Sequence, residues 1–368
     1  MLYIHIGAPK TGSSALQYFL LINREELLKN NIFYPEHEVD ENNICSGNAR
    51  VFFNHDVDGN SKEIQEQVTN VFHALDRGHT VLLSSESLFH TDPKKIYRLF
   101  DISDSKILVY LRRQDEYLLS LYSQRVKRRP EKNTLNVWLD DIMSKDNLAY
   151  YRAVDEWAEQ FGKNRVIVRP YEKAQFFGGT IFSDFFNIIG LDLSQEYSIP
   201  RSRINRSYSP DAVEYKRVLN ILTNRGDFLD RVLQKYSDSL DEHNTWPYSL
   251  LSPAKRIQIL ESFKERNAYL AREYLGREDG FFFEAPLPVT DEEWKPYPGL
   301  GEEKIREITD FIFKYDKRYI GIFREAVLSG LESQNSQERE AAETLVSILK
   351  YNMGLFAEIK YYLKSLIQ

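Results

Sequence analysis

The sequence contains a single cysteine, only three methionines and no excess of positive charge. Because Cys45 has no second cysteine to pair with, an internal disulfide and a cysteine-rich zinc site are both excluded. The net charge of −7 argues against a general nucleic-acid-binding protein, and no apolar run approaches the roughly 18 residues of a membrane-spanning helix. Any anion that this protein binds must therefore meet a local cluster of basic side chains.

The N-terminal segment also lacks the basic stretch and the following apolar stretch of a secretory signal, since residues 2–6 already have the pattern of a strand. A lone cysteine fits a reducing compartment. We therefore expect a cytoplasmic protein. With 42% hydrophobic residues among 368, the chain can form one large domain or two modest ones.

Short apolar runs alternate with amphipathic stretches through the first half of the chain. The runs cover residues 2–6, 80–84, 106–111 and 165–169, and a weaker run at 31–34 is typical of an edge strand. They are rich in Val, Ile, Leu and Tyr without polar alternation, which indicates strands that are covered on both faces. This order predicts an α/β fold with a parallel sheet flanked by helices.

Helical patterns replace the strand patterns after about residue 205. Ser209 and Ser252 each precede a proline, which places a capping serine before a proline at the first helical position. Two long helical patterns, about 302–331 and 336–367, predict an antiparallel hairpin. The domain organisation that we expect is an α/β core, a helical continuation of the same domain and a C-terminal all-helical hairpin, over residues 1–208, 209–300 and 301–368.

A loop bounded by Gly7 and Gly12 stands between the first predicted strand and the first predicted helix. Amides at the start of such a helix point toward the loop, and the helix dipole favours negative charge there. The loop region also supplies an ammonium group and three hydroxyls, from Lys10, Thr11, Ser13 and Ser14. The order of strand, loop and helix therefore predicts a P-loop-like site for a phosphate group.

The loop of nucleoside triphosphatases, G-x-x-x-x-G-K-[ST], has the same glycine spacing. Here position 13 is serine, and the lysine stands at position 10, ahead of the second glycine. A lysine after the second glycine reaches the β- and γ-phosphates of ATP, so the displaced Lys10 must reach different atoms. No apolar run ends in a metal-binding aspartate. A small-molecule kinase or nucleoside triphosphatase with a degenerate loop is therefore kept as the alternative hypothesis.

Residues 9–14, Pro-Lys-Thr-Gly-Ser-Ser, resemble the 5′-phosphosulfate loop of sulfotransferases, P-K-[TS]-G-[TS]-[TS]. Those enzymes take a sulfuryl group from 3′-phosphoadenosine 5′-phosphosulfate (PAPS). The resemblance implies that Lys10 contacts the bridging oxygen and the sulfuryl group. It also implies that loop amides and hydroxyls hold the 5′-phosphate, through Thr11, Gly12, Ser13, Ser14 and Ala15.

Sulfotransferases also hold the 3′-phosphate of PAPS, with an arginine at a strand end and a serine eight residues later. Arg112 follows the predicted strand at 106–111, and Ser120 has the required spacing. Arg113 would pair with Leu121, which has no donor. A guanidinium holds phosphate in a bidentate manner and a hydroxyl adds one donor. The resemblance therefore assigns Arg112 and Ser120 to the nucleotide.

A looser similarity to bacterial and carbohydrate-type sulfotransferases covers about residues 1–285. Residues 162–172 are similar to a late strand segment, and Arg206 stands where several members add a basic contact to the nucleotide. Asn267 lies on an apolar stripe that resembles a helix of many bacterial members, and we expect its amide to satisfy backbone groups. The C-terminal G-x-x-G-x-x-K segment of the animal cytosolic enzymes has no counterpart here.

The acceptor hydroxyl needs a general base, whose contribution to the rate is typically about 10²–10⁴-fold. Glu86 follows the strand at 80–84, and carbohydrate sulfotransferases commonly use a glutamate, so Glu86 is the leading candidate. Other members use histidine, which keeps His5, His55 and His90 as alternatives, although His5 within the first strand is expected to be a core residue. No metal-ligand spacing is evident, so we expect catalysis without a metal ion.

Together these features predict a PAPS-dependent sulfotransferase that acts on a hydroxyl of a carbohydrate or related small molecule. We expect neither a nucleic-acid partner nor a membrane span. A non-catalytic nucleotide-binding interaction protein is a further alternative, in which the C-terminal hairpin would be the surface that binds a partner. The same helices are the candidate contact for a homo-oligomer.

Overall fold

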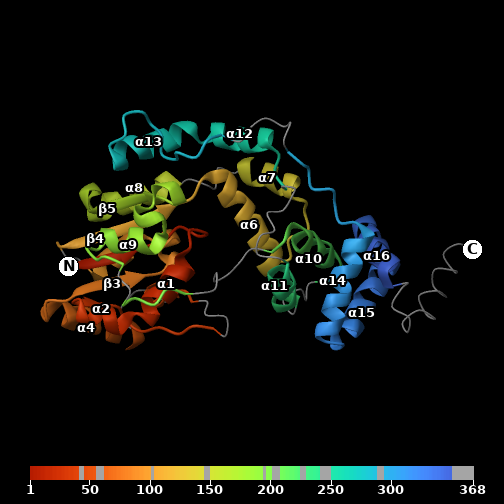
Figure 1. Cartoon of the computed structure of the whole chain (residues 1–368), viewed down its shortest axis with the longest axis horizontal. Helices are drawn as coiled ribbons and strands as arrows, with labels where there is room; N and C mark the ends of the chain where they lie inside the picture. Colours follow the sequence, from red (N-terminus) through yellow and green to blue (C-terminus); the bar gives the residue numbers. More distant parts are fainter. Residues whose placement is uncertain are drawn as a thin grey trace, which may run out of the picture. The chain divides into compact units, whose positions relative to one another are not determined.

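The computed structural model describes residues 1–40, 45–54, 62–100, 103–144, 150–193, 196–200, 208–223, 229–240, 250–287 and 294–349. Five parallel strands form one sheet in the order β2-β3-β1-β4-β5 (Figure 1). They are β1 (Leu2–His5), β2 (Ile32–Phe33), β3 (Thr80–Ser84), β4 (Ser105–Leu111) and β5 (Val166–Pro170). The four strong strand predictions and the weaker edge strand are confirmed, and so is the α/β fold class.

The central strand is β1, which pairs with β3 on one side and with β4 on the other. From β1 the chain first builds β2 and β3 on one side and then crosses to build β4 and β5 on the other. In the register, His5 at the end of β1 lies opposite Ser84 of β3 and Leu108 of β4. Open α/β sheets bind ligands at such a change of direction, outside the carboxyl ends of the strands.

Both faces of the sheet are buried. One face packs against α1 (Ser13–Ile22) and α9 (Ile181–Ile188) around an apolar cluster that includes Tyr3, Leu16, Phe19, Leu82, Leu108, Tyr110, Phe185 and Phe186. On the other face the alternate strand residues are buried as well, as at Ile4, Leu83 and Val109. This double coverage explains why the strands read as continuous apolar runs.

A buried carboxylate fixes α9 to the sheet. Asp184 is fully buried and accepts hydrogen bonds from Tyr110 Oη at 2.8 Å and from Arg169 Nη2 at 2.5 Å. It also accepts from the backbone N–H of Phe177 at 2.8 Å. A buried charge is tolerated when it is paired and hydrogen-bonded in this way. The network therefore ties β4, β5 and α9 together.

The remaining elements of the described residues are short helices. They are α2 (Arg24–Lys29), α3 (Val51–Asn54), α4 (Lys62–Asp76), η1 (Glu86–His90), α5 (Pro93–Leu99), α6 (Gln114–Arg128), α7 (Leu135–Ser144), α8 (Tyr150–Phe161), η2 (Lys163–Arg165), η3 (Lys173–Gln175), η4 (Phe177–Gly179), α10 (Pro210–Leu222), α11 (Asp230–Ser239), α12 (Pro253–Ser262), α13 (Lys264–Leu275), α14 (Glu302–Tyr315), α15 (Arg318–Glu332) and α16 (Ser336–Leu349).

The chain divides into two compact units. The first groups residues 1–117, 146–205 and 257–287 around the sheet, and the second groups residues 118–145, 206–256 and 288–368. Helix α6 begins in the first unit and continues in the second. The three domain ranges expected from the sequence, 1–208, 209–300 and 301–368, stay predictions.

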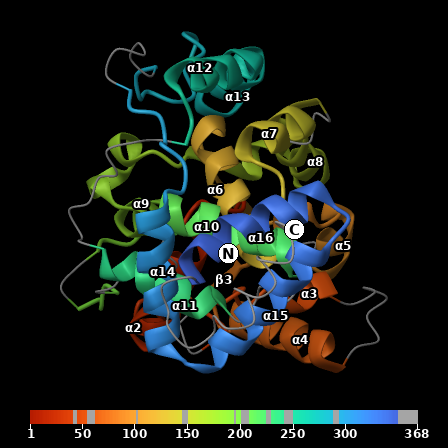
Figure 2. The same cartoon turned by 90° about the vertical axis from the view of Figure 1, so that its right-hand side faces the viewer.

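The second unit consists of helices, with α14, α15 and α16 beside α10 and α11 (Figure 2). Ser209 caps α10 by accepting from the Ala212 N–H at 3.1 Å, and Ser252 accepts from the Lys255 N–H at the same distance, so both predicted caps are confirmed.

The predicted continuous helix over 302–331 is wrong. It is interrupted at Asp316, whose carboxylate accepts from the Arg318 N–H at 2.9 Å and opens α15. Of the predicted helix 336–367, α16 covers 336–349, and residues 350–368 lie outside the described ranges.

Candidate functional site

Three loops meet at the carboxyl edge of the sheet, because β3, β1 and β4 are neighbours. Residues 6–12 follow β1, Ser85 and Glu86 follow β3, and Arg112 and Arg113 follow β4. The phosphate loop, the base and the nucleotide arginine were predicted in these three segments. The fold therefore brings them to one edge.

The loop after β1 has a tightly turned backbone. Gly7, Lys10 and Gly12 all have positive φ, at 39°, 69° and 77°, a conformation that is uncommon for a residue such as lysine. The Thr11 hydroxyl donates to the Ala8 carbonyl oxygen at 2.6 Å and closes the turn. Gly12 is the N-cap residue of α1 and, lacking a side chain, makes no capping hydrogen bond to the first turn. The amides at the start of α1 are thus placed to donate to an anion.

The inner wall of the loop is crowded around Gly7. A Cβ atom at Gly7 would lie 2.6 Å from Ser13 Oγ and 3.3 Å from His5 Nε2, so only glycine fits there. His5 Nε2 is buried and has no hydrogen-bond partner among the described residues. Backbone curvature, an inward hydroxyl and an unpaired buried nitrogen all suit a small anionic group. The residues present therefore fit the phosphosulfate end of PAPS.

Arg112 contacts the same loop from β4. Its Nη1 donates to the Lys10 carbonyl oxygen at 3.2 Å, and its Nε donates to Glu116 Oε2 at 3.1 Å. The guanidinium carbon also lies 5.8 Å from the centre of the Tyr171 ring. These contacts hold the guanidinium beside the loop, and its assignment to the nucleotide stays a prediction.

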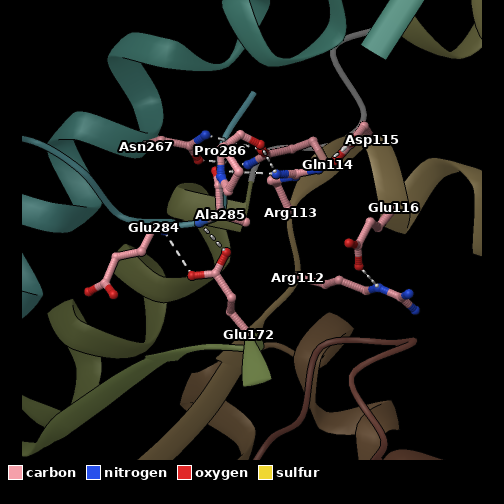
Figure 3. A network of polar contacts seen from close by, with 10 residues as sticks. All are labelled: Arg112, Arg113, Gln114, Asp115, Glu116, Glu172, Asn267, Glu284, Ala285 and Pro286. Carbon is pink, nitrogen blue, oxygen red and sulfur yellow. Dashed lines mark hydrogen bonds and ion pairs between the residues drawn. The ribbon is translucent and has the colours of Figure 1, made fainter. Parts of the chain in front are cut away.

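Arg113 contacts Asp115 and the segment at 284–286 (Figure 3). It forms a two-pronged ion pair with Asp115, at 2.9 and 3.0 Å, and it donates to the carbonyl oxygens of Ala285 and Pro286. In the same network, Glu172 accepts from the backbone N–H groups of Glu284 and Ala285. Arg113 therefore fastens the segment at 284–286 to the core. The assignment of Arg112, rather than Arg113, to the phosphate stays a prediction.

Asn267 takes part in this network through a side chain rather than through backbone groups, contrary to expectation. Its Oδ1 accepts from Gln114 Nε2 at 2.7 Å, and its Nδ2 donates to Gln114 Oε1 at 3.1 Å. The reciprocal amide pair joins α13 to the start of α6, directly after Arg113 (Figure 3). Asn267 thus has a structural role.

Glu86 is the first residue of η1 and is partly buried. Burial raises the pKa of its carboxyl group, and the ammonium group of Lys10 opposes that rise. The hydroxyl of Tyr117 belongs to the same surroundings, because burial and then the charge of Glu86 raise its pKa to about 12. A carboxylate with a raised pKa next to a loop cation is a reasonable general base.

The segment at 45–49 supports this corner of the site. A Cβ at Gly47 would lie 2.0 Å from the Ser84 carbonyl oxygen, so the backbone approaches the end of β3 more closely than any other residue would allow. Asn48 fixes the approach by accepting from the Ser84 N–H at 2.8 Å and donating to the Leu82 carbonyl oxygen at 3.1 Å. Ser85 adds a hydrogen bond from its hydroxyl to the Ser46 carbonyl oxygen at 2.7 Å.

Tyr171 was not singled out by the sequence analysis. It follows β5 at the same edge of the sheet, and its hydroxyl would lie 3.0 Å from a Cβ at Gly12. Burial raises the pKa of this hydroxyl, and the positive charge of Arg112 acts against the rise. Its position directly after a strand was the signal that could have identified it.

The other predicted site residues lie on α1, on α6, at the end of η1 or outside the described residues. Ser14 Oγ donates to the Cys45 carbonyl oxygen at 3.5 Å, and Ala15 is partly buried on α1. Ser120 lies on α6, partly buried, and its link to the nucleotide stays a prediction. His90 is exposed at the end of η1. The remaining two, His55 and Arg206, lie outside the described residues.

No group of three or more His, Cys, Asp and Glu side chains among the described residues could hold a metal ion. Among the helices that the structure describes, none combines the length and the apolar character needed to cross a membrane.

Comparisons with known proteins give sparse matches. No family model matches the sequence. An uncharacterized protein of Archaeoglobus fulgidus is 28% identical over 218 residues, which cover 55% of this chain and 55% of that protein. The chain thus matches about half the length of this relative. Among solved structures, a sulfotransferase from Alicyclobacillus acidocaldarius is similar with a TM-score of 0.34 and 17% identity, over 64% of this chain and 94% of that one.

Proposed function

We propose that this chain is a sulfotransferase that transfers a sulfuryl group from PAPS to a hydroxyl of a carbohydrate or related small molecule. The observation that carries the proposal is the contact between Arg112 and the loop that holds Lys10. Two basic residues, which the family pattern assigns to the two ends of PAPS, lie together at the ligand edge of a parallel sheet. A phosphate loop alone does not require a second cation beside it.

In the proposed reaction, the acceptor oxygen forms a bond to sulfur while the bond from sulfur to the bridging oxygen of PAPS breaks. The leaving group is the 5′-phosphate of 3′-phosphoadenosine 5′-phosphate (PAP), which gains negative charge as the bond breaks. Lys10 and the amides at the start of α1 are positioned to stabilise that charge, and fixed cations and amides commonly provide the largest part of such catalysis.

The acceptor proton goes to Glu86. Its raised pKa suits this task, because a carboxylate with a higher pKa is a stronger base once it is ionised. The proximity of the base and the leaving-group cation is supported by the effect of the Lys10 charge on the pKa of the Glu86 carboxyl group. The resemblance to sulfotransferases further implies that the reaction needs no metal ion.

The test is a transfer assay with purified full-length chain, PAPS and a panel of mono- and oligosaccharides, read by mass spectrometry. The proposal predicts at least one product that has gained one sulfuryl group, with near-total loss of turnover in Lys10→Ala. The matched control is Lys94→Ala, an exposed lysine of α5, which should keep full turnover. Equal turnover in both variants would contradict the role of Lys10.

A further inference from the structure

His5 is a fully buried polar residue that the proposed mechanism does not use. Its ring packs edge-on against Tyr110 and Phe185, with ring centres 6.1 and 5.7 Å apart. These contacts fix the plane of the imidazole from the side of α9. The direction of each ring nitrogen is therefore set by the core.

The two ring nitrogens have different surroundings. Nδ1 lies 2.9 Å from Ser84 Oγ, on the neighbouring strand. Nε2 is buried and has no hydrogen-bond partner among the described residues, and it lies 3.3 Å from the position of a Cβ at Gly7. Unpaired buried polar atoms are rare in folded proteins and call for an explanation. This nitrogen faces the inner wall of the phosphate loop.

The hydrogen bonds around Ser84 are compatible with a proton on Nε2 of His5. The Cys45 thiol, whose pKa burial raises to about 11, is protonated and donates to Gln17 Oε1 at 3.7 Å. Gln17 therefore presents its Nε2 to Ser84 Oγ, at 3.2 Å. A Ser84 oxygen that accepts from Gln17 can still donate its own proton to His5 Nδ1. The imidazole proton is then on Nε2.

Burial also lowers the pKa of His5 to about 3, so the ring is neutral at physiological pH. A neutral ring with its proton on Nε2 is a hydrogen-bond donor toward the loop, and it is a donor without the cost of burying a charge. Its basic nitrogen, Nδ1, is occupied by Ser84. This arrangement does not suit a general base, which was one of the roles considered for His5.

We propose that His5 is a binding residue of the phosphate loop, held by Ser84 as the Nε2–H tautomer so that it donates a hydrogen bond to an anionic oxygen of the bound donor. This inference rests on the proposed function, because it takes the loop as the site of the 5′-phosphosulfate.

The first test uses the unaltered chain, labelled with nitrogen-15 in histidine, and nuclear magnetic resonance. We expect Nε2 of His5 to have the chemical shift of a protonated ring nitrogen and Nδ1 that of an unprotonated one. Saturating PAP should move the Nε2–H resonance, while the exposed His90 serves as an internal reference. A proton on Nδ1, or an Nε2–H resonance that PAP binding leaves unmoved, would overturn the inference.

The second test compares PAP affinity in two variants by calorimetry. His5→Gln can keep an amide N–H near the position of Nε2, whereas His5→Asn keeps a polar group only near Nδ1. We expect PAP to bind His5→Asn about 10- to 100-fold more weakly, the usual effect of losing a hydrogen bond to a charged group, and His5→Gln to recover most of the affinity. Wild-type affinity in a folded His5→Asn would contradict the inference alone. Absence of PAP binding by the unaltered chain would contradict the proposed function itself.

Discussion

Arg112 Nη1 donates a hydrogen bond to the backbone carbonyl oxygen of Lys10 at 3.2 Å, although 102 residues separate the two in the sequence. The contact follows from the sheet order, because β1 and β4 are neighbours and both residues come shortly after their strands. It binds the arginine to the part of the loop that carries the lysine. The Arg112 guanidinium is therefore fixed relative to the loop before any ligand arrives, which reduces the ordering cost of binding.

The raised pKa of Glu86 should shift the acid limb of the pH–rate profile to higher pH. As a base Glu86 works only when ionised, so the rate falls as the pH drops through its pKa. Because burial raises that pKa, the fall should begin above the region, roughly pH 4.3, where an exposed glutamate titrates. Glu86→Gln should lose about 10²–10⁴ in rate and the acid limb with it. An unchanged acid limb in this variant would assign the limb to another group.

The charge of Lys10 should be visible in the titration of Glu86. Lys10 lowers the pKa of this carboxyl group, in opposition to burial. Lys10→Ala should therefore raise the pKa of Glu86 further, and Lys94→Ala should leave it unchanged. Carbon-13 resonance of the Glu86 carboxyl in the free protein measures this directly, without any need for turnover. A lowered pKa in Lys10→Ala would contradict the proximity of the two groups.

Asp184 should be a major contributor to stability. Asp184→Ala leaves Arg169 without its partner and Tyr110 Oη without its acceptor, so we expect the free energy of unfolding to drop by about 3–5 kcal/mol. Tyr110→Phe removes one hydrogen bond only and should cost about 1 kcal/mol. Urea denaturation measures both. Similar losses in the two variants would show that the ion pair with Arg169 contributes little.

Gly47 and Gly78 offer a matched pair of glycines. Both have φ close to +80°, but a Cβ at Gly47 meets the Ser84 carbonyl oxygen at 2.0 Å, whereas nothing lies within 4 Å of a Cβ at Gly78. Gly78→Ala should cost about 1–2 kcal/mol through backbone strain alone. Gly47→Ala should cost about 1–3 kcal/mol more through overpacking, and it should weaken catalysis because Glu86 lies close by. Equal unfolding free energies would argue against the close approach.

Much of the fold could be predicted because its signals are local. Apolar runs without alternation identified the buried strands, and the pairs Ser209-Pro210 and Ser252-Pro253 identified two helix starts through capping chemistry. The helix break at Asp316 also has a local cause. It was not predicted because apolar residues continue in helical spacing on both sides of it. There a carboxylate that bonds a backbone N–H two residues later outweighed the periodicity.

The candidate site was predictable only where a motif marks it. Lys10, Arg112 and Glu86 each follow a strand, and the parallel sheet brings them together. Tyr171 and the segment at 45–49 carry no such motif, since their positions depend on contacts between distant parts of the chain. His5 could be identified as a core residue from its strand, but the donor role of Nε2 depends on Ser84, Gln17 and Cys45 in three dimensions.

The most direct test of the central claim is calorimetry of the unaltered chain with PAP in a chelating buffer and, separately, with ATP and Mg²⁺. The account predicts that PAP binds without a metal ion and that Arg112→Ala weakens this binding by about 10- to 100-fold, because the arginine holds a phosphate through charge-assisted hydrogen bonds. Binding of ATP with Mg²⁺ and no binding of PAP would contradict the account and favour a kinase or nucleoside triphosphatase.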